Sequence, residues 1–291
     1  MYRNLAPKMT MAPIFATVLV VFVGGLIWTV AVSFTASRSI PDWRFVGFES
    51  WERLFINPRW GISYLNMIIF GVAYIFGSLV FGYLLAIFVD QKVRAEAFFR
   101  TVYLFPHALS FIVTGAVWQW FLNPQFGLQK LVQDLGWSEF GFNILNNRSF
   151  AIYAIVIAAI WHGAGIVMAL LLAGLRGVDE DIWKATRIEG IPRWRTYASI
   201  VLPMLGPAVA TCVVLLGAMA VKNYDLVVAM TGGGPGVATE VPAKFVMENL
   251  LERGNIAIAA AGATAMLMTV VSIAAPILYW QSWQRKRSKE A

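Results

Sequence analysis

Residues 60–89 read WGISYLNMIIFGVAYIFGSLVFGYLLAIFV, a stretch without a single Lys, Arg, Asp or Glu. A helix needs about 20 apolar residues to cross the hydrocarbon core of a bilayer, so this stretch is long enough to do so. The same absence of charge marks five other intervals, namely residues 9–37, 101–129, 149–175, 196–221 and 254–284. In lipid a backbone must satisfy its own hydrogen bonds, and a helix does so within one segment. The sequence therefore predicts an all-α membrane protein.

The composition of the whole chain agrees with this prediction. Of its 291 residues, 59% are hydrophobic and only 13% are charged, whereas soluble domains are about 25% charged. No periodic alternation of polar and apolar residues suggests a membrane barrel. We expect a single domain over 1–291 with six transmembrane helices, near residues 12–34, 61–89, 99–122, 149–175, 198–229 and 255–282.

Lys and Arg are distributed unequally between the two sides of the predicted topology. The amino terminus, the 90–100 and 176–195 loops and the carboxyl-terminal tail together carry 14 of them, whereas the 38–59, 123–148 and 231–253 loops carry 8. The richer side is expected to be cytoplasmic, with both termini inside. We interpret the net charge of +7 as an attraction to anionic lipid and not to nucleic acid. Cys212 is the single cysteine, so no intrachain disulfide can form.

The cytoplasmic loop 176–197 is unusually rich in charge for this chain. Most of the loop lies in or just before the stretch KATRIEGIPRWRTYASIVLP, residues 184–203. Apolar side chains recur there at three-residue spacing, namely Ile182, Ala185, Ile188 and Ile191. Acidic residues precede them, and Gly190 with Pro192 supplies a stop. The pattern predicts a short amphipathic helix within 179–192, outside the bilayer. Such a helix either rests on lipid headgroups or fits a protein socket; the mixture of acidic and basic residues favours a protein.

This loop resembles the EAA loop of ABC importer permeases, a cytoplasmic coupling helix with the pattern E-A-A, three residues, G, followed by L-P. The matching positions here are Lys184, Ala185, Thr186, Gly190, Leu202 and Pro203. The chain departs from the pattern in three places: Lys184 replaces the leading glutamate, Thr186 replaces the second alanine, and Glu189 replaces the usual aspartate. The departure at Lys184 puts in question the polar contact that the glutamate is expected to make with an ATPase.

Two further stretches support the same resemblance. YLFPHALSFIVTGAVWQWFLNPQFGL (103–128) resembles the third helix and following outer loop of carbohydrate permeases, and NYDLVVAMTGGGPGVATEVPAKFV (223–246) resembles their fifth helix and glycine-rich external loop. Together with the EAA-type loop, the similarity covers a core of about 60–280. The chain thus resembles the permease subunits of binding-protein-dependent sugar importers of the maltose and α-glucoside type, which implies a type I ABC importer permease architecture.

The resemblance implies partners for each side of the molecule. A second homologous permease completes the pathway in the bacterial cytoplasmic (inner) membrane. An ATP-binding cassette ATPase dimer meets the coupling helix through Lys184, Ala185, Thr186, Glu189 and Gly190. An extracytoplasmic solute-binding protein meets the external loop 231–253 through Gly232, Gly233, Gly234, Pro235 and Gly236. The chain contains no GxxxxGK[ST] motif, so we expect ATP and Mg to be used by the partner, with no cofactor, metal or catalytic residue in this chain.

The resemblance also implies a path for the sugar. The positions that match sugar contacts of the family are Asn223, Trp161, Gly163, His107 and Phe111. His107 and His162 are the chain's two histidines, and both fall in predicted spans, as does Lys222 at the edge of the fifth. One interpretation of these basic side chains is an anionic cargo, such as a sulfonated or acidic sugar. Alternatively, the histidines hydrogen-bond neighbouring helices, and Lys222 pairs with Asp225 on one helix face.

Two other classes of membrane protein are weaker interpretations. A secondary sugar transporter driven by an ion gradient would act without an ATPase, but it often shows internal repeats. We find no clear repeat, and a coupling loop would serve no purpose there. A membrane enzyme would need convergent titratable groups, which the spans do not supply. Uptake that requires an ATPase separates the importer from both.

Overall fold

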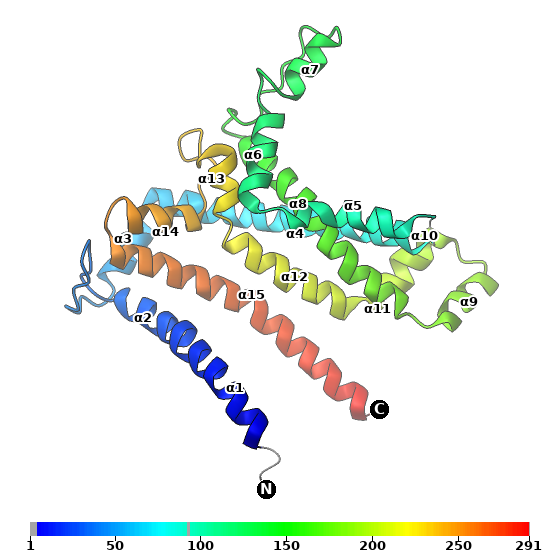
Figure 1. Ribbon diagram of the computed structural model, residues 1–291, viewed down its shortest axis with the longest axis horizontal. Helices are drawn as coiled ribbons and strands as arrows, with labels where there is room; N and C mark the ends of the chain where they lie inside the picture. The colour runs from blue at the N-terminus through cyan, green and yellow to red at the C-terminus, as the bar shows by residue number, and fades with distance from the viewer. Residues whose placement is uncertain (1–4, 92–93, 291) are drawn as a thin grey trace. The chain divides into compact units, whose positions relative to one another are not determined.

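The computed structural model describes residues 5–91 and 94–290 (Figure 1). Within these residues the regular structure is helical, with turns and loops between the helices and one isolated β-bridge between Thr35 and Phe45. The helices are α1 (Leu5–Val18), α2 (Gly24–Val32), α3 (Glu49–Ile56), α4 (Pro58–Asp90), α5 (Glu96–Ala108), α6 (Phe111–Phe121), α7 (Leu128–Asp134), α8 (Ala151–Arg176), α9 (Glu180–Ile188), α10 (Arg193–Arg195), α11 (Leu202–Met204), α12 (Gly206–Val221), α13 (Asp225–Thr231), α14 (Pro242–Leu251) and α15 (Ile256–Glu290). The prediction of an all-α protein is confirmed.

The chain divides into two compact units, which are described separately. One comprises residues 1–61 and 242–268, and the other comprises residues 62–241 and 269–291. The expectation of a single domain stays a prediction.

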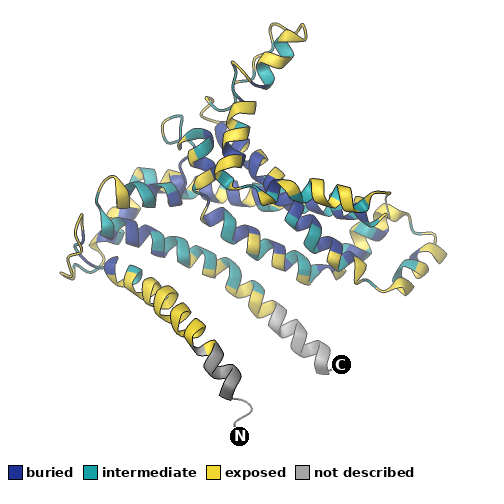
Figure 2. Cartoon of the chain, viewed as in Figure 1, coloured by how far each residue is buried: buried dark blue, intermediate teal, exposed yellow. Residues whose placement is uncertain are grey.

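The first unit begins with an apolar helical run. α1 continues through a π-helical turn at Leu19–Val23 into α2. Residues Pro13–Val32 are long and apolar enough to cross a membrane, and nearly all of their described side chains are exposed. Figure 2 shows most of the described run in yellow, with teal and dark blue only at its end, where Val32 is buried. Its exposed surface is suited to lipid or to another membrane chain.

Charged side chains join α14 to the first turn of α4 within this unit. The Arg59 guanidinium lies 2.6 Å from Glu248, and Lys244 and Arg253 lie 3.2 Å and 2.8 Å from the same carboxylate. The hydrogen bonds from Arg59, reinforced by those from Lys244 and Arg253, hold the pKa of Glu248 well below its usual range despite its burial. Trp60 and Phe245 pack edge to face beside the cluster, with ring centroids 5.4 Å apart.

The second unit is built around α8, which Figure 2 shows largely in dark blue. α5, α6, α12 and α13 all pack against it. Close packing depends on glycine: a Cβ on Gly163 would lie 2.7 Å from the Tyr74 hydroxyl, and one on Gly165 would lie 2.1 Å from the Tyr103 carbonyl oxygen. Small residues let membrane helices approach one another closely in this way.

The predicted membrane spans are recovered, two of them in a different form. Four single helical segments could span a membrane, within Pro13–Val32, Pro58–Asp90, Ala151–Arg176 and Ile256–Trp280. Two bent pairs raise the number to six if each pair is one span. The third and fifth predicted spans are each a bent pair of helices, a feature that the prediction did not specify.

The third span bends by 97° between α5 and α6. Leu109 is extended, with ψ of 150°, and the Ser110 side chain caps α6 by accepting a hydrogen bond from the Val113 amide at 3.3 Å. Ser at this position satisfies an amide that a new helix start leaves free. The chain therefore begins a second helix here, and this cap was not part of the prediction.

The fifth predicted span, 198–229, is interrupted more than once. A π-helical segment, Thr196–Val201, leads into α11, and the pair Arg193–Met204 and Gly206–Val221 bends by 73°. Pro203 and Pro207 stand on either side of the bend, and proline lacks the amide that a continuous helix needs. α12 then ends at Val221, and residues 222–224 separate it from α13.

Candidate translocation and coupling sites

The predicted amphipathic helix forms as α9, whose start and end are both fixed by local chemistry. The Asp179 carboxylate accepts the Asp181 amide at 2.9 Å, which caps the first turn. At the other end, Gly190 has φ of 67°, the Ile191 amide donates to the Thr186 carbonyl, and the Gly190 amide donates to the Arg187 carbonyl. These two bonds make a Schellman ending, which favours glycine at the left-handed position. The predicted stop at Gly190 is confirmed, and the helix is shorter than 179–192.

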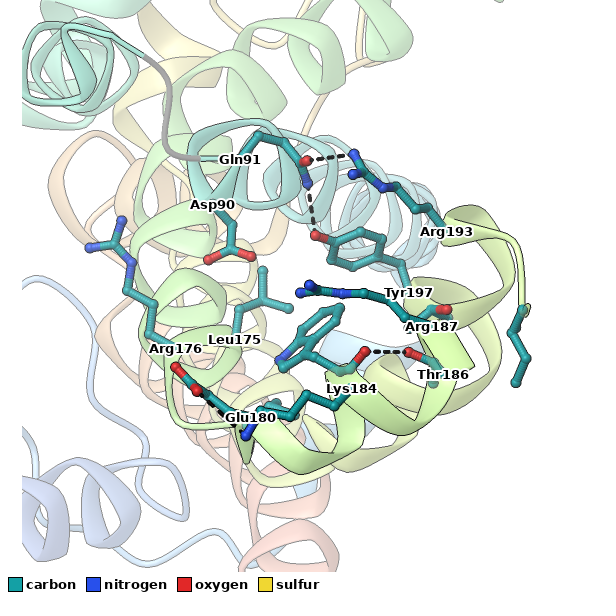
Figure 3. Close-up of a pocket in the computed structure, with 14 residues that line it drawn as sticks. Asp90, Gln91, Leu175, Arg176, Glu180, Lys184, Thr186, Arg187, Arg193 and Tyr197 are labelled. Atoms are coloured by element: carbon teal, nitrogen blue, oxygen red, sulfur yellow. Dashed lines mark hydrogen bonds and ion pairs between the residues drawn. The ribbon is translucent and has the colours of Figure 1, made fainter. Parts of the chain in front are cut away.

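One face of α9 is held against the rest of the second unit. Trp183 packs on Tyr197, with ring centroids 5.3 Å apart, and Thr186 is buried. The Tyr197 hydroxyl accepts a hydrogen bond from Gln91 at 2.8 Å, and its carbonyl accepts one from the Tyr83 hydroxyl at 2.9 Å. A polar cavity of about 780 Å³ lies beside these contacts, and Figure 3 shows Arg187 reaching into it from α9.

The opposite face of α9 is apolar and uncovered. Ile188 is 86% exposed, and Ala185 is also exposed. Lys184 lies 2.9 Å from Asp181 and 3.9 Å from Glu180, so its charge is compensated within the helix. The α9 apolar face, defined as Ile182, Ala185 and Ile188, thus has two exposed members and one half-buried member, Ile182, and is bordered by charged side chains.

Three of the predicted path residues come together near the bend between α5 and α6. The Phe111 and His162 rings stack with centroids 4.2 Å apart, and the His107 and His162 centroids are 5.1 Å apart. His162 is buried, and its Nδ1 lies 3.3 Å from the Thr114 Oγ1, at hydrogen-bond distance. The Nδ1 atom of His107 is buried without a hydrogen-bond partner.

Asn223 occupies the break between α12 and α13. Its side chain is only 7% exposed, yet neither its amide nitrogen nor its amide oxygen has a hydrogen-bond partner. An unpaired buried amide is costly, and such a group in a native structure calls for an explanation. Non-helical backbone at membrane depth is tolerated where it is buried in protein or lines a cavity.

The remaining path residues make other contacts. Lys222 is exposed, and in the described part of the chain no ion pair joins it to Asp225, so the structure does not show the pairing considered from the sequence. Trp161 is partly exposed and contacts Trp118, with ring centroids 6.1 Å apart. Gly163 faces Tyr74 on α4, where it allows close packing.

The glycine-rich loop is ordered by its own hydrogen bonds. Gly232, Gly233 and Gly236 have positive φ values of 60°, 91° and 65°. The Thr239 hydroxyl donates to the Gly234 carbonyl at 2.8 Å and lies 2.7 Å from the Thr231 hydroxyl. Asn66 on α4 donates to the carbonyls of Ala238 and Glu240, which fixes the far side of the loop.

Sequence reasoning missed two buried hydroxyl residues near the predicted path residues His162 and Gly163. Thr114 contacts His162, and the Ser78 Oγ is buried without a partner. Each is a hydroxyl inside a charge-free interval, which was the available signal, but hydroxyls are common enough in membrane helices that position alone did not single them out. Among the described residues no group of three His, Cys, Asp or Glu could hold a metal.

Known proteins resemble this chain over most of its length. It is 34% identical to the probable ABC transporter permease protein PH1215 of Pyrococcus horikoshii, with 88% of each chain covered. It is 32% identical to the xylose/arabinose import permease protein XacH of Haloferax volcanii, with 89% of this chain and 82% of that protein covered. A bacterial ABC transporter that imports the acidic polysaccharide alginate has the same fold, with a TM-score of 0.79 at 16% identity over 98% of this chain and 96% of the other.

These matches confirm the resemblance to permease subunits of carbohydrate ABC importers and the predicted architecture. Residues 78–287 also match a family of membrane components over most of the chain, including the bent spans, α9 and the glycine-rich loop. The chain belongs to the binding-protein-dependent transport system inner membrane component family.

Proposed function

We propose that this chain is one of two permease subunits that enclose a pathway for a sugar or glycoside and carry it unchanged into the cell. The second subunit is a homologous permease, and a separate ATPase dimer uses ATP and Mg. The family membership supports the transport role, and the relative named for xylose and arabinose supports a carbohydrate cargo. Both termini lie in the cytoplasm, as the distribution of Lys and Arg indicates.

The uncovered apolar face of α9 is the observation that carries this proposal. Ile188 is a large aliphatic side chain at 86% exposure on a helix whose other face is packed and whose ends are capped. A rigid helix with a charged rim and an apolar centre fits a cleft in another protein, where its apolar area is removed from water. We assign that cleft to the ATPase, with Gly190 closing the helix and Glu189 and Lys184 on its rim.

The proposed cargo path passes two interruptions of the membrane helices, the bend between α5 and α6 and the break between α12 and α13. Asn223 presents a donor and an acceptor that the chain itself leaves unused, and an amide can pair with a sugar hydroxyl in either sense. Phe111 supplies an aromatic face beside the histidines, on which the apolar face of a sugar ring can stack. Trp161 and Gly163 stay proposed path residues from motif position alone.

The charge of the cargo is a separate part of the proposal. Two histidines lie within 5.1 Å of each other at the path, and His107 keeps an unpaired ring nitrogen that can donate to an anionic group. Lys222 is exposed beside Asn223 and is free of an ion pair with Asp225 in the described residues. These observations support an acidic or sulfonated sugar as the alternative to a neutral one.

The solute-binding protein is assigned to the loop that contains Gly232, Gly233, Gly234, Pro235 and Gly236. Its backbone is held by internal hydrogen bonds, and its glycines present no side chains to a partner. A preformed loop of this kind loses little conformational freedom on binding. It can therefore approach the cargo-loaded protein closely and help release the sugar.

Uptake measurements with and without the partners test the proposal. Cells or proteoliposomes with the complete transporter are expected to take up labelled sugar only when ATP, the ATPase and the binding protein are all present. Ile188→Lys should abolish that uptake and the copurification of the ATPase. Leu135→Lys is the matched control, because Leu135 is a similarly exposed aliphatic residue remote in sequence from α9. Uptake by this chain alone, driven by an ion gradient, would instead establish a secondary transporter.

A further inference from the structure

A small polar cavity lies beside the glycine-rich loop, apart from the path residues described above. Its volume is about 270 Å³, and its walls come from the end of α6, from residues 145–146 and from the loop that follows α13. Three amide side chains line it, those of Gln119, Asn123 and Asn146, together with the Thr231 hydroxyl. All of these residues belong to the second unit.

The amides of this cavity are available to a ligand. The Asn123 Oδ1 accepts the Gln125 amide at 2.8 Å, which leaves its Nδ2 as a donor. In the described part of the chain no hydrogen bond engages the side chains of Gln119 and Asn146, which keep both donors and acceptors. Thr231, by contrast, is occupied by Val227, Thr239 and the Gly233 amide, so it forms a fixed wall.

The chemistry of the lining selects among ligands. Among the residues that the structure describes, no ionisable side chain lines the cavity, so it offers no charge to pair with phosphate, sulfate or carboxylate. Amides donate and accept, which suits hydroxyl groups. Pockets for drug-sized ligands begin at about 300 Å³, so this cavity fits one sugar ring and not an oligosaccharide.

Two helices join this cavity to the central path residues. α6 carries Phe111 at its start and Gln119 near its end, and eight residues of helix span about 12 Å. α13 begins two residues after Asn223 and ends at Thr231. The two helices lie side by side (Figure 1), and a Cβ on Gly115 of α6 would come within 2.5 Å of the Ala229 Cβ of α13. This close pairing holds the cavity at a set distance from Phe111 at one end of α6 and from Asn223 before α13.

We propose that Gln119, Asn123 and Asn146 form an entry subsite that receives one hydroxyl-rich ring of the cargo before it reaches the central breaks. The inference rests on the proposed function, because only a sugar transporter has a use for such a site beside the loop assigned to the binding protein. The subsite recognises hydroxyls and is indifferent to a charge carried elsewhere on the cargo.

Near-isosteric variants of the complete transporter test the subsite. Uptake of radiolabelled xylose, maltose and an alginate oligosaccharide is measured first, and the sugar that the unmodified transporter carries is then used. Gln119→Leu and Asn146→Leu should each raise the KM of uptake about 2- to 12-fold, the loss expected for one neutral hydrogen bond, with little change in the maximal rate. Gln125→Leu and Asn143→Leu are the controls, because these exposed amides belong to the same segments but do not line the cavity.

A filling variant gives a second measurement. Asn146→Trp should occlude the cavity and lower uptake more than tenfold, whereas Asn143→Trp should leave it unchanged. Membrane levels and thermal melting confirm that each variant is folded. Pocket variants that behave like their controls would overturn the subsite while leaving sugar transport intact, whereas absence of uptake of every sugar by the unmodified transporter would overturn the proposed function itself.

Discussion

At the scale of single residues, Gly190 is required by its backbone conformation and not by a lack of space for a side chain. Its φ of 67° lies in the left-handed region, but an added Cβ would meet no atom within 4 Å. A side chain there therefore costs backbone strain, about 1–2 kcal/mol, and not a clash. The Schellman ending shows that the glycine is needed to stop α9 at this point.

Gly190→Leu is expected to abolish coupling between ATP hydrolysis and transport, because the helix end and the surface beside it both change. Gly190→Asn should retain most activity, since asparagine tolerates the left-handed conformation. Gly177→Ala is the control, because Gly177 ends α8 with negative φ. Sugar-stimulated ATPase activity of the purified complex is the measurement, and normal stimulation in Gly190→Leu would rule out this role for the glycine.

Asn223 and Lys222 distinguish a neutral cargo from an anionic one. Asn223→Ala removes a neutral hydrogen bond, which is worth about 0.5–1.5 kcal/mol, whereas loss of a bond to a charged group costs about 1.5–3 kcal/mol. Lys222→Met should therefore weaken transport more than Asn223→Ala only if the cargo is anionic. Because Asp225 is exposed and makes no ion pair with Lys222 among the described residues, the Met variant strands no buried charge. Uptake of matched charged and uncharged sugars measures both effects, and equally small losses would place neither residue on the path.

At the scale of elements, the sequence predicted where helices lie better than where they break. The charge-free intervals located every span because lipid excludes charge along a whole segment. The bends depend on a few atoms: the Ser110 hydroxyl begins α6, and Pro203 and Pro207 flank a change of direction. Hydropathy averages over such details. The sequence placed His107, Phe111 and His162 among the path candidates, but the contacts between their rings became visible only in the fold.

The ion cluster that joins α14 to α4 makes a prediction about acid stability. Glu248 has a pKa below its usual range, so its stabilising contribution is complete above its unfolded pKa, about 4.3. It is lost as the pH falls from there toward the folded pKa, because protonation then favours the unfolded chain. Glu248→Gln should lower the melting temperature at pH 7 and flatten its dependence on pH between about 5 and 3. Glu52→Gln, at an exposed carboxylate of α3 in the same unit, should change neither. A Glu248→Gln protein that melts with the unmodified pH profile would contradict the assignment.

At the scale of the whole molecule, the proposed transport requires that the break at Asn223 face each side of the membrane in turn. In the proposed mechanism, closure of the ATPase dimer moves α9 as a rigid body and turns the cavity outward, as in hinge and shear transitions of packed domains. α9 can transmit this motion because Trp183 packs on Tyr197 of the π-helical segment Thr196–Val201, and the Tyr197 carbonyl accepts a hydrogen bond from Tyr83 of α4. Asn223 should then be reachable from outside only while nucleotide keeps the ATPase closed.

The single cysteine of the chain makes this alternation measurable. Cys212 is buried, so replacing it by serine leaves a background in which one introduced thiol reports on one position. A membrane-impermeant thiol reagent added from outside should label Asn223→Cys when ATP and vanadate trap the closed ATPase, and should label it far more slowly without nucleotide. Asn143→Cys, in the exposed segment before α8 and outside the proposed subsite, should be labelled equally in both states. Equal labelling of Asn223→Cys with and without trapped nucleotide would mean that the break does not change sides, because an alternating pathway cannot leave the same atom open to the same solvent throughout its cycle.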